Sequence, residues 1–357
     1  MTRAARAIID LGALQHNLRK VRTAAPGRRV MAVIKANGYG HGIITVAHAL
    51  VEADAYAVAC LDEAMSLREA GITRPIVLLE GFFSAAELPI LVRENITTVV
   101  HHDSQLDMLE QAALNGALQV WIKIDSGMHR LGFAPEQATA VWQRLQVCAG
   151  VSVIGFMSHL AGADERHDDS TQRQTRLFND ALATLPGKRS LANSAGILAW
   201  PDTQNDWVRP GLMLYGVSPF PGQTGADLGL QPVMSLQSQL IAIHPRRRGE
   251  RIGYGGDYLC PADMTVGVVA IGYGDGYPRR ISPGAPLLIN GRRAPLIARV
   301  SMDMLCVDLR DQPAARCGDP VILWGPQLPV EEVAAAAGTI PYELLCRVTA
   351  RVRKQTR

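Results

Sequence analysis

Short aliphatic runs alternate with stretches of helical period through the first two thirds of the chain. We expect β-strands at residues 30–34, 55–59, 76–79, 97–100, 120–124, 151–156, 190–192 and 213–215. The clearest helix spans residues 104–115, where Asp103 or Ser104 can cap its start and Gly116 can close it. Eight strand-helix units predict an α/β fold, a (β/α)8 TIM-like barrel, with a doubly wound parallel sheet as the alternative.

The pattern changes after Tyr215, because residues 216–232 contain four glycines and three prolines and the alternation stops. Beyond this segment the apolar runs are short and separated by Gly and Pro, at residues 233–243, 265–270, 286–289 and 321–323. One late helix is expected at residues 330–337. We therefore predict a barrel domain over residues 1–228 and a mostly β C-terminal domain over residues 229–357.

Composition and charge exclude several classes of protein. The chain has 357 residues, 48% of them hydrophobic, and a formal net charge of +3, so it is an ordinary globular protein with no basic tract for nucleic acid. No apolar stretch reaches the length of a membrane span, and the N-terminus lacks the apolar segment of a signal peptide, so we expect a cytoplasmic protein. The six cysteines show no metal-ligand spacing, and we expect them to be reduced and buried.

A lysine at the end of a buried strand is the first sign of chemistry. Lys35 follows the predicted strand 30–34, and three glycines come shortly after it in the segment KANGYGHG. Burial removes solvation from an ammonium group and favours the neutral amine, which can form a Schiff base. A lysine paired with a carboxylate is the more ordinary interpretation, and this segment alone does not decide between the two.

Nine segments in order resolve that choice. They are KANGYGHG (35–42), KIDSGMHRLGF (123–133), MSHLAGADE (157–165), ANSAG (192–196), WVRPGLMLYG (207–216), GYGG (253–256), GYGDGYPR (272–279), RVSMDM (299–304) and PYEL (341–344). Together they closely resemble the motifs of alanine racemases, from residue 9 to about residue 351. The resemblance implies a pyridoxal phosphate enzyme that racemises a small amino acid, namely alanine.

The resemblance also implies the catalytic pair. Lys35 would be the Schiff-base lysine and one catalytic base, and Tyr254 would be the second base on the opposite face of the substrate. Racemisation needs two such groups, because one removes the Cα proton from one face while the other supplies a proton to the other face. Without the family match, Tyr254 would be interpreted as an ordinary surface tyrosine.

Further residues are implied to bind the cofactor. Arg209 would donate a hydrogen bond to the pyridine nitrogen, which must then stay unprotonated because a guanidinium only donates. His159 would lie beside Arg209. The phosphate group would be bound by hydroxyl and backbone N–H groups of Tyr39, Ser194, Gly211, Leu212 and Tyr342, partly in the loops after the seventh and eighth barrel strands.

The remaining implied residues concern the substrate. Arg130 would bind the substrate carboxylate and the cofactor phenolate, with Lys123 nearby as a possible site of carbamylation. Met302 and Asp303 would also contact the substrate, and the entrance would be lined by Asp164, Tyr273, Arg279 and Arg299. Gly38 and Leu160 depart from the family, which usually has alanine and an aromatic residue there. No metal is expected, and the resemblance implies a homodimer with sites shared between chains.

Three other functions share parts of this pattern. An amino-acid decarboxylase can have the same architecture, but it usually pairs the pyridine nitrogen with a carboxylate, and Arg209 argues against this. A non-catalytic pyridoxal phosphate carrier lacks a second domain, and a barrel that binds a sugar phosphate is the third alternative. Neither the role, in cell-wall synthesis or alanine breakdown, nor activity on serine follows from these residues.

Overall fold

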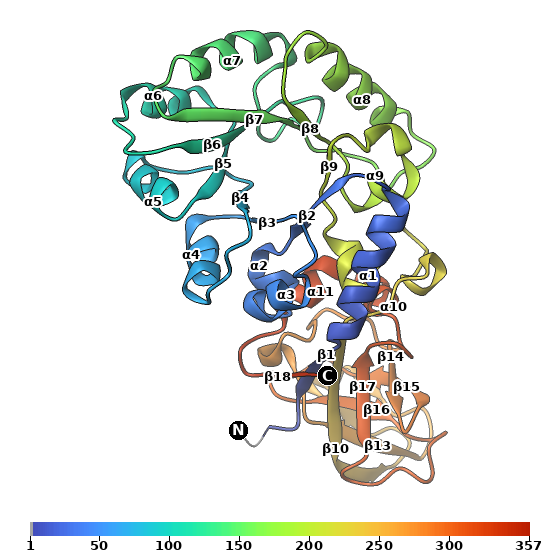
Figure 1. Cartoon of the computed structure of the whole chain (residues 1–357). Coiled ribbons are helices and arrows are strands. Elements are labelled where there is room, and N and C mark those ends of the chain that lie inside the picture. Colours follow the sequence, from blue (N-terminus) through green and yellow to red (C-terminus); the bar gives the residue numbers. More distant parts are fainter. Residues whose placement is uncertain (1–2) are drawn as a thin grey trace.

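Eight parallel strands form a closed barrel in the first domain. The structure is a computed structural model that describes residues 3–357 (Figure 1). Strands such as β3 and β5 are buried along their whole length, as is usual for aliphatic strands covered on both faces. The barrel strands are β2 (Arg29–Val33), β3 (Ala55–Val58), β4 (Ile76–Leu78), β5 (Ile96–Val100), β6 (Leu118–Lys123), β7 (Val151–Met157), β8 (Lys188–Ser190) and β9 (Trp207–Val208).

Helices surround this barrel. They are α2 (Lys35–Tyr39), α3 (Ile43–Ala49), α4 (Leu61–Glu69), α5 (Leu88–Arg93), α6 (Asp103–Gln111), α7 (Ala138–Gln146), α8 (Ser170–Ala181) and α9 (Ser194–Ala199), with 3-10 turns η1 (Ala85–Glu87), η2 (Pro135–Gln137), η3 (Pro201–Thr203) and η4 (Leu212–Tyr215). Only the short turn η4 follows β9. Helix α1 (Leu11–Ala24), which precedes the barrel, packs against α3, α9 and η4 and so takes the place of an eighth helix.

The second domain is a mostly antiparallel sheet. Its order is β13-β16-β15-β14-β17-β10-β1-β18, and β10 also pairs with β13, so six strands close on themselves. The strands are β1 (Arg6–Ile9), β10 (Met234–Arg246), β13 (Met264–Val269), β14 (Pro286–Ile289), β15 (Arg292–Ile297), β16 (Leu305–Asp308), β17 (Pro320–Trp324) and β18 (Arg353–Thr356). A separate small hairpin joins β11 (Arg251–Ile252) to β12 (Tyr258–Leu259).

Short helices and turns complete this domain. They are α10 (Val330–Ala336), α11 (Pro341–Arg347), η5 (Ala226–Leu228), η6 (Tyr254–Gly256) and η7 (Tyr273–Asp275). Helix α11 packs against α2 of the barrel, so the second domain contacts the connection that follows the first barrel strand (Figure 1). Among residues 3–357, no helix combines the length and hydropathy needed to cross a membrane.

The predicted (β/α)8 barrel followed by a mostly β domain is confirmed, and several details were wrong. Residues 213–215 are not a strand but part of the turn η4, and the eighth strand is β9; the seventh strand ends at Ser190 instead of beginning there. Helix α6 is capped by His102 rather than by Asp103 or Ser104, and it ends at Gln111. Strand β1 pairs with β10 and β18, so the N-terminal residues join the second sheet although we assigned them to the barrel.

Candidate active site

Lys35 begins a left-handed turn at the carboxyl end of the first barrel strand. The short helix α2 contains three consecutive residues with φ between 52° and 62°, Ala36, Asn37 and Gly38, and Tyr39 follows with φ 50°. Left-handed backbone costs roughly 1–2 kcal/mol for each residue that has a side chain. Strain of this kind is typically found where a functional group must be held in one direction. This chain has Gly38 where the family usually has alanine, and glycine removes that cost at one position of the turn.

Side-chain acceptors hold the turn from outside. The carboxylate of Glu63 accepts hydrogen bonds from the backbone N–H of Asn37 (3.3 Å) and of Ala59 (2.9 Å). The Asn37 side chain in turn accepts from the N–H of Ile43 at 2.9 Å, which ties the turn to the start of α3. Lys35 itself is half-buried. The turn is therefore held at Asn37, two residues after the lysine, through both its backbone and its side chain.

Hydroxyl and N–H donors gather after the seventh and eighth barrel strands. Ser194 is buried at the start of α9, and its Oγ accepts from the backbone N–H of Gly211 (3.0 Å) and of Met213 (3.3 Å). The Tyr39 hydroxyl reaches the same place, since a Cβ at residue 211 would lie 2.6 Å from its oxygen. Leu212 lies between these donors and is buried. The group has the donors that bind a phosphate.

Arg209 is a buried guanidinium just beyond β9. It donates to Ser190 Oγ (2.6 Å), to the carbonyl of Ser158 and to the carbonyl of Leu191 (3.3 Å). Burial lowers the pKa of Arg209 to about 10. Within residues 3–357 no carboxylate forms an ion pair with it, so the ordinary interpretation of an arginine paired with an acid does not hold. Its acceptors are neutral groups that fix its direction.

Positive charge dominates the mouth of the barrel. Lys123, at the end of β6, is only 9% exposed, and its pKa falls to about 8 because of burial first and then the nearby charges of Arg209, Arg130 and Lys35. None of these four cations forms an ion pair with a carboxylate in the described part of the chain. Burial and the same arginines lower the pKa of His159 to about 3, so this histidine is neutral at physiological pH. The cluster is suited to an anionic ligand.

Arg130 lies in a loop that is ordered by one carboxylate. Asp125 accepts hydrogen bonds from the backbone N–H of Gly127 and of His129, both at 3.0 Å, and His129 adopts a φ of 55°. Arg130 follows at once and is exposed. Its charge contributes to the low pKa of Lys123, so the loop brings it to the same mouth.

Tyr342 and Asp164 come to this mouth from different segments of the chain. The ring of Tyr342, on α11, lies 5.9 Å from that of Tyr39. The charge of Asp164, in the loop after β7, raises the pKa of Tyr342, although burial has the larger effect. The residues brought together in one chain are thus the barrel residues and Tyr342, which comes from the second domain.

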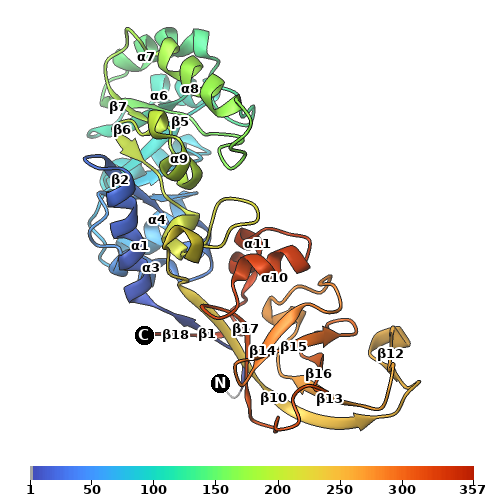
Figure 2. The same cartoon turned by 90° about the vertical axis from the view of Figure 1, so that its right-hand side faces the viewer.

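The other predicted residues lie elsewhere in the chain. Tyr254, in η6, is 65% exposed and belongs to the β11–β12 segment, which lies on the side of the second domain away from the barrel (Figure 2). Arg299 forms an ion pair with Asp257 in the same segment. Met302 is exposed, and Asp303 forms an ion pair with Arg351.

Tyr273 and Arg279 belong to this second group. The backbone N–H of Tyr273 donates to the carbonyl of Ser301 at 3.0 Å, so η7 lies beside the segment that contains Met302 and Asp303. Arg279 is exposed a few residues further along. The predicted site residues therefore form two groups, one on the barrel and one on the second domain, and Tyr254 is far from Lys35 within one chain.

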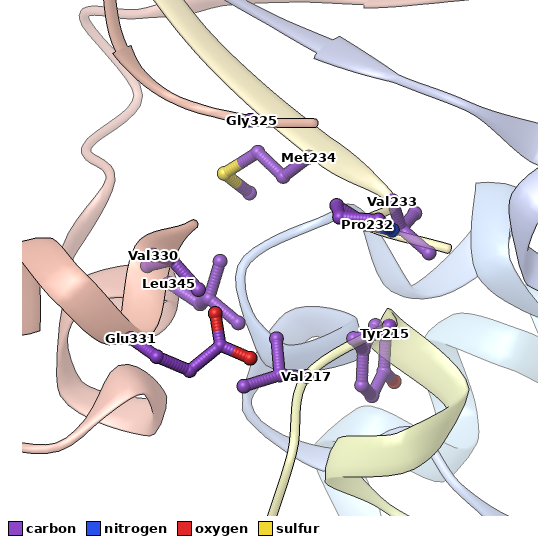
Figure 3. Close-up of a pocket in the computed structure, with 10 residues that line it drawn as sticks. Tyr215, Val217, Pro232, Val233, Met234, Gly325, Val330, Glu331 and Leu345 are labelled. Atoms are coloured by element: carbon purple, nitrogen blue, oxygen red, sulfur yellow. The ribbon is translucent and has the colours of Figure 1, made fainter. Parts of the chain in front are cut away.

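A cavity with room for about one water molecule lies between the domains, and its lining includes none of the predicted site residues (Figure 3). Tyr215, Val217 and Leu345 contribute apolar walls. Glu331 is its charged residue, and its carboxylate accepts from the backbone N–H groups of Ser218 (3.0 Å) and Gly225 (2.8 Å). The cavity is too small for a cofactor. The hydrogen bonds of Glu331 beside it link helix α10 to the segment that follows the barrel.

Some residues were missed or misjudged from the sequence. Ser158 and Ser190, which hold Arg209, were not singled out. Ser158 could have been noticed because it comes soon after a predicted barrel strand, whereas Ser190 was predicted to begin its strand and ends it in the structure. All six cysteines are free as expected, but only Cys148 and Cys260 are buried. Cys60 and Cys306 are half-buried, and Cys317 and Cys346 are exposed, so the expectation of burial was wrong for these four.

Comparisons with known proteins give one consistent result. Residues 9–219 match the family described as alanine racemase, N-terminal domain, and residues 233–356 match alanine racemase, C-terminal domain. The chain is 56% identical to alanine racemase of Nitrosococcus oceani over 97% of each chain. A crystal structure of biosynthetic alanine racemase from Pseudomonas aeruginosa is 46% identical, with a TM-score of 0.97 over 100% of both chains. A structure from Bartonella henselae, described with covalently bound pyridoxal phosphate, is 29% identical, with a TM-score of 0.90 over 99% of both chains.

Proposed function

Because this chain belongs to the alanine racemase family, whose members are isomerases, we propose that it interconverts L-alanine and D-alanine with pyridoxal phosphate held on Lys35. Two observations carry the proposal: a cluster of cations that have no carboxylate partner among residues 3–357, and the hydroxyls of Ser194 and Tyr39, which both lie at Gly211. This donor set fits the phosphate and phenolate of that cofactor. Its D-alanine would supply peptidoglycan, or the enzyme would serve alanine catabolism.

Each predicted site residue has a separate role in this reaction. Bound pyridoxal phosphate supplies an electron-withdrawing ring that acidifies the Cα–H bond of the substrate. Lys35 exchanges a proton with Cα on one face, and Tyr254 does so on the other. Arg209 would donate to the ring nitrogen of the bound cofactor and keep that nitrogen unprotonated, because a guanidinium has no acceptor. Arg130 would bind the substrate carboxylate and the cofactor phenolate, Met302 and Asp303 would also contact the substrate, and Asp164, Tyr273, Arg279 and Arg299 would line the entrance.

Covalent labelling tests the cofactor site. The purified protein is expected to be yellow, and reduction with borohydride followed by peptide mapping is expected to place the label on Lys35. Lys123 is the internal comparison, because it also lies at the barrel mouth. A label on Lys123 would overturn the assignment, and chiral chromatography of alanine after incubation tests the reaction itself.

We also propose a head-to-tail homodimer in which Tyr254 of one chain completes the site at Lys35 of the other. The exposure of Tyr254 and its position away from the barrel of its own chain support this arrangement. Inactive Lys35→Ala and Tyr254→Phe subunits are mixed in equal amounts and allowed to exchange. Each heterodimer then has one site with both lesions and one with neither, so about a quarter of wild-type sites return. Heterodimers that form without any recovery of activity would exclude a shared site.

A further inference from the structure

His41 is the penultimate residue of the KANGYGHG segment and has no part in the function described above. Its side chain is only 1% exposed. The residue lies just after the left-handed turn that begins at Lys35 and contains Tyr39. A histidine this deeply buried needs a reason, because its two ring nitrogens must lose their contacts with water.

One ring nitrogen is bound to the turn itself. Nδ1 of His41 lies 2.8 Å from the carbonyl oxygen of Tyr39 and 3.0 Å from that of Gly38. Both partners are acceptors, so Nδ1 must carry the proton and donate to them. The backbone N–H of His41 also donates to the Gly38 carbonyl at 3.0 Å. Two successive carbonyls of the strained turn are therefore held by one side chain.

The other ring nitrogen is free of partners. Nε2 of His41 is buried and has no hydrogen-bond partner among residues 3–357. Burial lowers the pKa of His41 to about 4, so the ring is neutral at physiological pH. A proton on Nε2 would have no acceptor, which independently favours the tautomer with the proton on Nδ1.

The rings around His41 extend toward the proposed phosphate site. His41 packs on Tyr215 with centroids 4.6 Å apart, and Tyr215 stacks on Tyr39 at 4.7 Å. The Tyr215 hydroxyl donates to the carbonyl of Val33 in the first barrel strand at 3.1 Å. The hydroxyl of Tyr39 then lies beside Gly211. Movement at His41 would thus be passed on to Tyr39 and to the start of the turn at Lys35.

We propose that His41 is a positioning residue, whose Nδ1–H holds the carbonyls of Gly38 and Tyr39 and thereby keeps the left-handed turn in the conformation that directs Lys35 and Tyr39 to the cofactor. The proposal rests on pyridoxal phosphate being the ligand. In a protein without this donor, the turn relaxes when the cofactor is absent, and binding must then restore the strained conformation. Removing the His41 donor is therefore expected to lower the affinity for pyridoxal phosphate more than it lowers the free energy of unfolding.

Two substitutions separate the hydrogen bond from the packing. His41→Asn keeps an N–H donor at the position of Nδ1 and removes the ring, whereas His41→Phe keeps a ring against Tyr215 and removes the donor. His48→Phe is the matched control, because His48 is an exposed histidine on the neighbouring helix α3. For each full-length protein, cofactor is removed, pyridoxal phosphate is titrated back by visible absorbance, and thermal unfolding of the cofactor-free form is recorded.

We expect His41→Phe to weaken pyridoxal phosphate binding about tenfold or more, because the Tyr39 carbonyl loses its side-chain donor and the Gly38 carbonyl keeps only backbone N–H donors. His41→Asn and His48→Phe are expected to stay within about threefold of the wild type. Three results would overturn the role of the Nδ1–H donor. Both His41 variants could bind pyridoxal phosphate equally weakly, or both could bind it with wild-type affinity. In the third, His41→Phe would bind the cofactor as the wild type does while His41→Asn would not. A loss of affinity that only follows a lower unfolding temperature would also overturn that role.

A measurement on the wild type covers the case in which a variant fails to fold. Nitrogen-15 NMR of histidine-labelled protein reports which ring nitrogen carries the proton, and we expect Nδ1 of His41 to be protonated. A proton on Nε2 would overturn the proposal without any substitution. Wild-type protein that binds no pyridoxal phosphate, by contrast, would contradict the proposed function and leave the tautomer of His41 as a separate result.

Discussion

Replacing Lys123 with methionine should make the cofactor-free protein more stable at neutral pH. Lys123 is almost completely buried beside Arg130 and Arg209, and its pKa falls from 10.5 to about 8. This fall corresponds to about 3 kcal/mol of unfavourable free energy for the charged form, an upper value for what the variant can gain. Methionine has a similar length and no charge, so the packing of the site is largely kept.

The stability advantage of Lys123→Met over the wild type depends on pH in a predictable direction. Below about pH 8 Lys123 is protonated in both the folded and the unfolded chain, so the full cost of its buried charge is present. Between about pH 8 and 10.5 the folded protein releases the proton while the unfolded chain keeps it, and stability rises with pH. The advantage of Lys123→Met over the wild type is therefore expected to be largest at pH 7 and to disappear toward pH 10.5.

Urea unfolding in buffers free of carbon dioxide measures this difference, with Lys188→Met as the control for an exposed lysine. An advantage of Lys123→Met that does not change between pH 7 and 10.5, or a variant less stable than the wild type at pH 7, would refute the reasoning. Adding bicarbonate tests carbamylation in the same assay. The neutral amine attacks carbon dioxide and loses a proton, and the resulting anion between two arginines should stabilise the wild type but not Lys123→Met.

Three further substitutions follow from the packing of the site. Gly211→Ala should weaken pyridoxal phosphate binding about tenfold in an absorbance titration, because its Cβ would lie 2.6 Å from the Tyr39 hydroxyl. Gly40→Ala should lower the free energy of unfolding in urea by about 2 kcal/mol or more, since its φ is 80° and its Cβ would lie 2.0 Å from the Leu345 carbonyl. Asp275→Asn should lower it by about 3 kcal/mol, because this fully buried carboxylate forms ion pairs with two arginines.

The barrel could be predicted because each of its strands is recognisable from its own residues. A strand that is buried on both faces is a continuous aliphatic run, as at residues 55–58 and 96–100, and it can be read without knowing its neighbours. The eighth strand could not be recognised in this way, and its predicted position was wrong. Trp207 and Val208 form only two residues of strand, while the more apolar residues 212–215 turn away, since Gly211 and Gly216 bound a 3-10 turn there.

The amino-acid sequence by itself determined the order of elements, the two-domain composition and, through the matched motifs, the family and its candidate residues. The tertiary structure decided what depends on contacts between distant segments. Residues 6–9 lie beside β10 and β18, the turn at Lys35 is left-handed under side chains from His41 and Glu63, and Arg209 is held by two serine residues instead of an acid. Hydrophobic periodicity reports only which face of a segment is buried, whereas pairing, handedness and hydrogen-bond partners are set by the groups that packing brings together.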